Sequence, residues 1–368
     1  MRNKIFKNME WWIPISSILL CLIGFVALYS ASQGVNFEYF KKQLIWFAIS
    51  FAIMAILIFI DYETIAKISP VIYGASIISL IAVLFTKQIN GASSWFNIGF
   101  FSFQPAEFAK ISVILFTSSV FVKLQQNNKS DINKIWKLAI AVITVMVPVG
   151  LIVLQPDYGT ATAFLVAFIL MLFVSGIDIK YIIGAILIIA VAIPLAYMYV
   201  LPKHAKTRID VFLNPESDPK GAGYNILQSK MAIGAGELTG MGILNGNQTQ
   251  LGYLSPKTTD FIYSVIGEEM GFIAAGAVIL LYATLIAKSL YVAKTAKDDL
   301  GCYIATGISG IFLFHMTENI GMTIGLLPIT GVPLLFISYG GSSLITSFIC
   351  IGILLNISGN RKKSIFIK

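Results

Sequence analysis

Long apolar runs separated by short polar connections dominate the chain. A helix needs about 20 mostly apolar residues to cross a bilayer. Ten stretches meet this requirement, namely 11–31, 43–61, 68–86, 105–123, 135–154, 159–176, 181–201, 260–287, 302–326 and 333–356. The pattern therefore predicts an all-α polytopic membrane protein with ten transmembrane helices. We expect a single membrane domain over residues 1–368.

Two segments outside these runs stand out. The connection at about 202–259, between the seventh and eighth predicted helices, is much longer than the others. Residues 89–103 are too interrupted by polar residues and glycines to span a membrane, and Trp95 with several phenylalanines suits the headgroup region. We expect one large loop and one interfacial segment, both on the outer side.

Composition and charge narrow the class of protein. Hydrophobic residues make up 57% of the chain and charged residues 12%, against about 25% charged in ordinary soluble domains. The net charge of +8 is scattered between apolar runs, so nucleic-acid binding is not expected. In the short connections, Lys and Arg concentrate on the side that holds both ends of the chain, which predicts cytoplasmic N and C termini and an extracellular long loop.

Ionisable residues in or beside the predicted spans each need a physical reason. Glu107 and Lys110 are i,i+3 neighbours, and their spacing alone favours a structural ion pair over a substrate site. Asp157 follows Pro156 in a short turn, and Asp260 precedes the eighth span; both positions favour helix N-capping over catalysis.

No metal-binding pattern is visible. Cys21, Cys302 and Cys350 lie in apolar runs without CxxC spacing, and His204 and His315 lack a second ligand at metal spacing. We therefore expect no transition-metal site. The small residues around Ser342 suit either close helix packing or a groove for a lipid or sugar.

Five polar motifs, taken in order along the chain, resemble the SEDS family (shape, elongation, division and sporulation). They are QPAEFAK at 104–110, QPDYGT at 155–160, NPESDPKGAGYNILQS at 214–229, TDFIYSVIGEEMG at 259–271 and NIGMTIGLLPITGVPLLFISYGGSS at 319–343. The resemblance covers essentially the whole chain. Short termini and the run 318–322 favour an elongation-type member, with division-type and sporulation-type members as alternatives.

The resemblance implies an activity, a location and partners. Members polymerise lipid II into peptidoglycan glycan strands by inverting glycosyl transfer, releasing undecaprenyl pyrophosphate at the outer face of the bacterial cytoplasmic membrane. The implied partners are a class B penicillin-binding protein (a transpeptidase), lipid II, lipid-linked glycan and other cell-elongation machinery. The implied role is cell elongation and shape.

The resemblance also assigns site residues. The catalytic carboxylate falls on Asp260, and the other family positions fall on Trp95, Glu107 and Lys110. Ser94 stands where the family often has arginine before the tryptophan, so Arg208 is our candidate for the missing cationic contact.

We add Asp157 and Ser342 as candidate substrate contacts. Asp260 would act as the base for the acceptor hydroxyl if the low-dielectric interface raises its pKa, although a helix start favours the anion. A divalent cation, Mg²⁺ or Mn²⁺, bridging the pyrophosphate and a carboxylate is compatible with these oxygen ligands and would need no dedicated protein cage.

Two other function classes stay open on the sequence. A lipid II flippase or transporter would carry polar residues at the bilayer midplane and discontinuous helices in related halves. A non-catalytic scaffold would keep its partner without needing Asp260. The ionisable residues crowd the predicted outer end, and this favours the enzyme.

Overall fold

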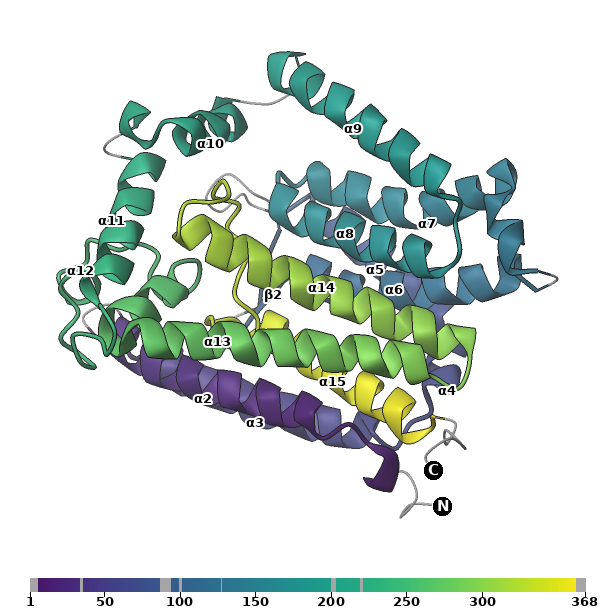
Figure 1. Ribbon diagram of the computed structural model, residues 1–368, viewed down its shortest axis with the longest axis horizontal. Helices are drawn as coiled ribbons and strands as arrows, with labels where there is room; N and C mark the ends of the chain where they lie inside the picture. The colour runs from purple at the N-terminus through teal and green to yellow at the C-terminus, as the bar shows by residue number, and fades with distance from the viewer. Residues whose placement is uncertain are drawn as a thin grey trace.

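The computed structural model describes residues 6–33, 36–86, 94–98, 101–126, 128–199, 203–218 and 221–361. Its elements are α2 (Trp12–Ser32), α3 (Glu38–Leu57), α4 (Tyr62–Lys67), α5 (Ser69–Val83), β1 (Phe96–Ile98), β2 (Phe101–Phe103), α6 (Pro105–Leu124), η1 (Lys129–Asn133), α7 (Ile135–Val153), α8 (Tyr158–Val174), α9 (Ile179–Tyr199), α10 (Lys203–Leu213), η2 (Pro215–Ser217), α11 (Ala222–Ala235), α12 (Asn247–Gln250), α13 (Ile262–Thr295), α14 (Asp299–Thr323) and α15 (Gly341–Gly359). Figure 1 shows the long helices running side by side.

A helix overlaps each of the ten predicted spans, and the predicted mainly helical fold is confirmed. By length and composition, seven helices in the described part of the chain are suited to crossing a membrane: α2, α3, α6, α7, α13, α14 and α15. The apolar helices α5 and α8 are shorter. The described side chains of α9 are mostly exposed, as expected for a helix that faces lipid.

Three predictions of local structure were wrong or incomplete. The span predicted at 333–356 begins only at Gly341, because 324–340 is not helical. The long loop contains α10, η2, α11 and α12 instead of irregular backbone alone. Within the described part of 89–103, β1 pairs with β2 as an antiparallel hairpin; residues 89–93, 99 and 100 lie outside the described residues.

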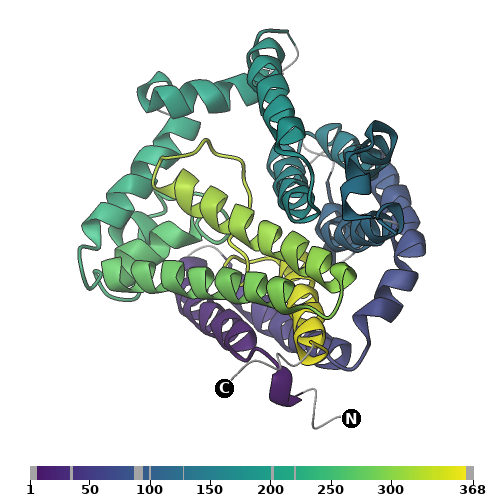
Figure 2. The same cartoon turned by 45° about the vertical axis from the view of Figure 1, so that its right-hand side comes forward.

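The helices pack around α14 and α15. α13 packs on both α14 and α2, α15 on α3, α14 on α8, and α5 on α6. The two views place α9 and α10 away from this bundle and α11 and α12 at one end of it (Figures 1 and 2).

At the opposite end the Glu10 backbone N–H donates to the Ser358 hydroxyl at 2.9 Å. The two terminal parts of the described chain therefore meet at one end.

The apolar segment 324–340 is not helical, and its second half is largely buried in protein. Ile324 and Leu326 are exposed, whereas Val332 and residues 334–338 are buried. Glycines and Pro333 interrupt any helix in this segment. Backbone polar groups at this depth need partners within the protein. Gln43 of α3 binds the Ser338 carbonyl at 3.0 Å and the Gly340 N–H at 3.2 Å, and the Tyr282 hydroxyl donates to the carbonyl of residue 335.

Helix α13 is broken at Gly271, whose φ of 77° favours glycine. A short segment of the long loop supplies hydrogen bonds at the break: the Met241 N–H donates to the Glu268 carbonyl, and the Phe272 N–H to the Glu237 carbonyl, both at 2.9 Å. The Glu268 carboxylate accepts the N–H and hydroxyl of Thr249 in α12. The long loop is thus hydrogen-bonded to the N-terminal part of α13, the part that follows Asp260 in the sequence.

Candidate active site

Asp260 lies where the long loop enters α13. Its side chain is partly exposed. The N-cap position of α13 is held by Phe261, and no side chain caps the helix there. The capping role favoured by the sequence pattern was therefore wrong. Its Oδ2 lies against Gly331, and a Cβ atom at that glycine would be 3.5 Å away. Its backbone carbonyl accepts the Asn319 side-chain amide at 2.9 Å, so α14 fixes its position.

The surroundings of Asp260 make it a stronger base than an ordinary aspartate. Burial raises the pKa of Asp260, and the hydrogen bond with Thr259 and the positive charge of Arg208 oppose this rise without cancelling it. Helix capping, which would have favoured the anion, is absent from this position. The exposed Arg208 donates from Nη1 to the Thr330 carbonyl at 3.3 Å. A partly exposed base therefore lies in the field of an exposed cation.

Glu107 and Lys110 form the predicted ion pair on α6, with Lys110 Nζ 2.9 Å from Glu107 Oε1. Glu107 is 2% exposed and Lys110 3%. Two cavities lined by Lys110 hold about 10 Å³ each, which is room for about one water molecule. Lys110 Nζ also lies 2.9 Å from Nε2 of His315 on α14. In this arrangement the pair acts on the site through its neighbours, and its direct contact with substrate stays a prediction.

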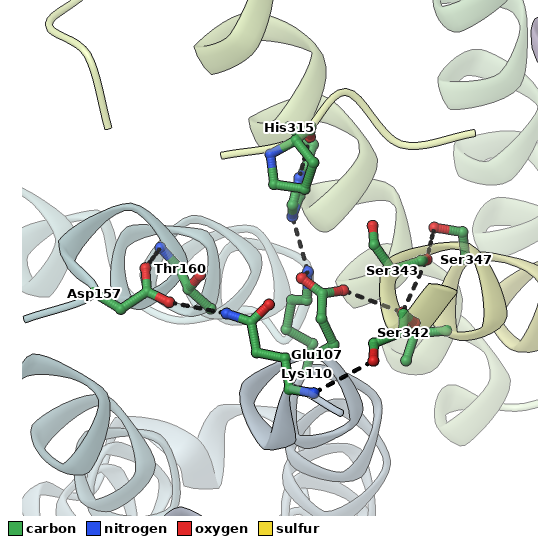
Figure 3. A network of polar contacts seen from close by, with 11 residues as sticks. Glu107, Lys110, Asp157, Thr160, His315, Ser342, Ser343 and Ser347 are labelled. Carbon is green, nitrogen blue, oxygen red and sulfur yellow. Dashed lines mark hydrogen bonds and ion pairs between the residues drawn. The ribbon is translucent and has the colours of Figure 1, made fainter. Parts of the chain in front are cut away.

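A polar network continues from this pair to Asp157 (Figure 3). Thr346 donates to Glu107 Oε2 at 3.2 Å. Ser342, one turn earlier on α15, accepts the Gln104 N–H and donates to the Ser102 carbonyl, each at 3.3 Å. The Gln104 side chain then donates to Asp157 at 3.2 Å.

Asp157 caps α8 as predicted, accepting the Thr160 N–H at 3.1 Å. Burial raises the pKa of Asp157, and the bond from Thr160 opposes the rise. Asp157 is partly exposed, whereas Ser342 is buried. Both have positioning tasks in the network, and their contact with substrate stays a prediction.

The close-packing alternative for the small residues near Ser342 is supported at Gly341. A Cβ there would lie 2.8 Å from the Trp46 ring. This distance is too short for any side chain, so glycine lets α15 approach α3. The same holds at Gly159, where a Cβ would collide with the Val332 side chain of the 324–340 loop.

Trp95 stands just before β1 and is 36% exposed. The preceding Ser94 is buried, and its hydroxyl has no hydrogen-bond partner in the described part of the chain. Ser94 is therefore too short and too enclosed to replace an arginine. Arg208 is the cation that the structure places near Asp260.

Six of the predicted residues thus fall into two groups beside the 324–340 loop, and Trp95 has no hydrogen bond with either group among the described residues. Asp260 and Arg208 flank the loop at Gly331 and Thr330. The other four, Glu107, Lys110, Asp157 and Ser342, belong to the largely buried network. Sequence reasoning missed His315 and Asn319 as site residues. Their signal was a histidine and an asparagine four apart within an apolar span, since buried polar groups there need partners.

The described residues contain no group of three or more His, Cys, Asp or Glu side chains arranged for a metal ion. A cation at Asp260 would therefore take most of its ligands from a bound molecule.

Comparison with known proteins identifies the family. The model of the FtsW/RodA/SpoVE family of cell cycle proteins matches residues 10–363. The chain is 36% identical to the peptidoglycan glycosyltransferase MrdB of Escherichia coli K12, over 94% of this chain and 92% of the relative. It is also 36% identical to a probable peptidoglycan glycosyltransferase FtsW of Trichlorobacter lovleyi, over 98% of this chain and 96% of the relative.

A solved structure described as "Structural coordination of polymerization and crosslinking by a peptidoglycan synthase complex" aligns with a TM-score of 0.83 and 26% identity, covering 96% of this chain and 99% of that one. The curated relatives and the solved structure are similar to this chain over nearly its full length. The chain is a multi-pass membrane protein of the FtsW/RodA/SpoVE (SEDS) family.

Proposed function

We propose that the protein is a peptidoglycan glycosyltransferase that polymerises lipid II into glycan strands. The observation that carries the proposal is Asp260, a partly exposed carboxylate with a raised pKa beside Arg208, held at the end of the bundle that carries the long loop. Its relatives named as peptidoglycan glycosyltransferases support the same activity.

Asp260 accepts the proton of the acceptor sugar hydroxyl in this proposal. The hydroxyl oxygen attacks the anomeric carbon of the donor as the bond from that carbon to the pyrophosphate oxygen breaks. One base suffices for such a direct displacement, which inverts the anomeric centre. Undecaprenyl pyrophosphate leaves, and Arg208 stabilises its charge, since guanidinium binds phosphate oxygens in a bidentate manner.

Membrane topology and partners follow from the same proposal. The chain crosses the bacterial cytoplasmic membrane ten times with both termini inside, and the long loop with Asp260 faces outward. A class B penicillin-binding protein would cross-link the product, in keeping with the synthase complex to which the fold is similar. A Mg²⁺ or Mn²⁺ ion shared between the substrate pyrophosphate and a carboxylate would add positive charge there.

The elongation role is part of the proposal, with division and sporulation roles as alternatives. Relatives named MrdB and relatives named FtsW are both up to 36% identical to this chain, so identity does not separate the roles. The run from Glu318 to Met322 favours elongation.

The direct test is polymerisation of purified lipid II by the wild-type protein and Asp260→Asn, with and without a class B penicillin-binding protein. Asn keeps the shape but cannot take up a proton, so we expect glycan synthesis to fall at least 100-fold. Asp178→Asn is the matched control, because Asp178 is exposed and paired with Lys180 away from the site. Undiminished synthesis by Asp260→Asn would remove Asp260 from the mechanism.

The break in α13 at Gly271 is a feature that a flippase would share with this enzyme. Movement of lipid II across liposome membranes separates the two functions. Transport by Asp260→Asn at the wild-type rate, with no glycan synthesis by either protein, would favour the flippase.

A further inference from the structure

We propose that His315 is a positioning residue, which sets the location of the Lys110 ammonium relative to the loop that holds Asp260. The inference rests on the proposed glycosyltransferase function. His315 lies in α14, is 1% exposed, and is the side chain that contacts both Lys110 and the 324–340 loop.

The two ring nitrogens of His315 have different partners. Nε2 lies 2.9 Å from Lys110 Nζ, and Nδ1 lies 2.9 Å from the Pro333 carbonyl oxygen. An ammonium group only donates and a carbonyl only accepts. The imidazole is therefore neutral, with its proton on Nδ1 and a lone pair on Nε2.

The contact of His315 with Pro333 is linked to Asp260 by Asn319, which binds both the loop and the Asp260 backbone. Asn319 lies four residues after His315 on α14, so both side chains point from one face. Its amide donates to the Val332 carbonyl at 2.8 Å and to the Asp260 carbonyl at 2.9 Å. Consecutive loop carbonyls are thus held by one helix face, and that face also holds the backbone of the proposed base.

The contact to Lys110 reaches the other half of the site. Lys110 pairs with Glu107, whose second oxygen accepts from Thr346 of α15. Loss of the imidazole would leave a buried ammonium N–H without its acceptor, and such a group costs free energy until it moves. The ammonium and the loop would then relax separately, and reacting groups misplaced by about 1 Å can lose a factor of about 100 in rate.

Three variants separate the two contacts. His315→Leu removes both, His315→Gln places an acceptor near the position of Nε2, and His315→Asn places a donor near the position of Nδ1. Each full-length variant is assayed with lipid II for kcat and KM, and its thermal unfolding is measured in the same detergent.

We expect kcat of His315→Leu to fall at least tenfold with KM within twofold, and at least one amide variant to recover part of kcat. A purely structural role predicts instead a lower Tm with unchanged kcat per folded molecule in all three variants. That result, or full activity in His315→Leu, overturns the proposal.

The tautomer gives a readout independent of activity. In the ¹⁵N spectrum of histidine-labelled protein, assigned with His204→Gln, the His315 signal should show protonated Nδ1 and unprotonated Nε2. A proton on Nε2 overturns the contact. A wild-type protein that makes no glycan overturns the proposed function and the catalytic part of this inference, while the tautomer still decides the contact.

Discussion

Asp260 combines two opposing influences at the scale of a single residue. Burial raises its pKa, and Thr259 and Arg208 lower it by less. An aspartate whose pKa is raised stays protonated, and therefore inactive as a base, up to a higher pH than an ordinary one. In a plot of kcat against pH, the rise of activity on the acid side should consequently lie at a higher pH than for an ordinary aspartate.

Removing the positive charge of Arg208 should move this acid-side rise in kcat to a still higher pH. Arg208→Gln eliminates a charge that favours the carboxylate, so the acid limb of the kcat profile should shift to higher pH and kcat should fall. Lys206→Gln on the same helix is the control, since Lys206 contacts the Met198 carbonyl and lies over Tyr197. A limb that stays in place in Arg208→Gln would contradict the coupling to Asp260.

The Glu107–Lys110 pair should dominate stability at this scale. Breaking a buried pair leaves an uncompensated charge and typically costs about 3–5 kcal/mol. We expect Lys110→Met to lower the free energy of unfolding by about this amount, and Glu107→Gln with Lys110→Met to recover most of it. Thermal unfolding in detergent measures both. Additive losses in the double variant would show that the two charges do not depend on each other.

Helices were the elements that the sequence predicted best. Apolar length predicted most helix ends to within a few residues, although α15 begins eight residues later than predicted and α13 ends eight residues later. Pro105 and Asp157 marked the starts of α6 and α8. Residues 333–340 were wrongly predicted as part of a helix, because the apolar side chains of residues 334–337 are buried by protein instead of lipid and hydropathy does not distinguish the two.

The candidate site was partly within reach of the sequence. Spacing predicted the ion pair on α6 and the cap at Asp157, because both depend on residues a few positions apart. His315 and Asn319 were missed because their partners lie across the bundle or in the 324–340 loop. Contacts between distant segments leave no pattern along the chain.

Gln43 should be essential for the 324–340 loop, because its amide serves two loop backbone groups. Gln43→Ala leaves both groups buried without that partner, and each such loss costs about 1–3 kcal/mol. We expect a clear drop in Tm and in polymerisation.

Ser50→Ala on the same helix is the matched control for Gln43→Ala. Ser50 is buried, and its hydroxyl has no partner among the described residues, so its removal should leave Tm unchanged or raise it. Equal Tm values for Gln43→Ala and the wild type would show that the loop does not depend on this amide.

At the scale of the whole molecule, the two terminal segments meet at one end of the bundle. Glu10 also lies 3.0 Å from Lys288, and the same end carries the pair of Lys297 with Glu63. Lys288 and Lys297 thus lie at this end, and the long loop lies at the other end. The positive-inside rule expects this arrangement if the loop faces outward.

Cysteine labelling should confirm the ten-span topology. Cys21 and Cys350 are buried, and Cys302→Ser removes the remaining accessible thiol. In that background, a membrane-impermeant maleimide should label Glu216→Cys in intact cells and Gln126→Cys only after lysis, since both positions are exposed. Labelling of both in intact cells would contradict the proposed orientation.

The largely buried residues 332–339 of the 324–340 loop have a consequence for exchange of amide hydrogens with deuterated water. Loops usually exchange early, because their N–H groups face solvent. Here the N–H of Leu334 donates to the Ser338 hydroxyl and that of Tyr339 to the Thr258 carbonyl, within a buried segment. This stretch should take up deuterium as slowly as the centres of the long helices around it.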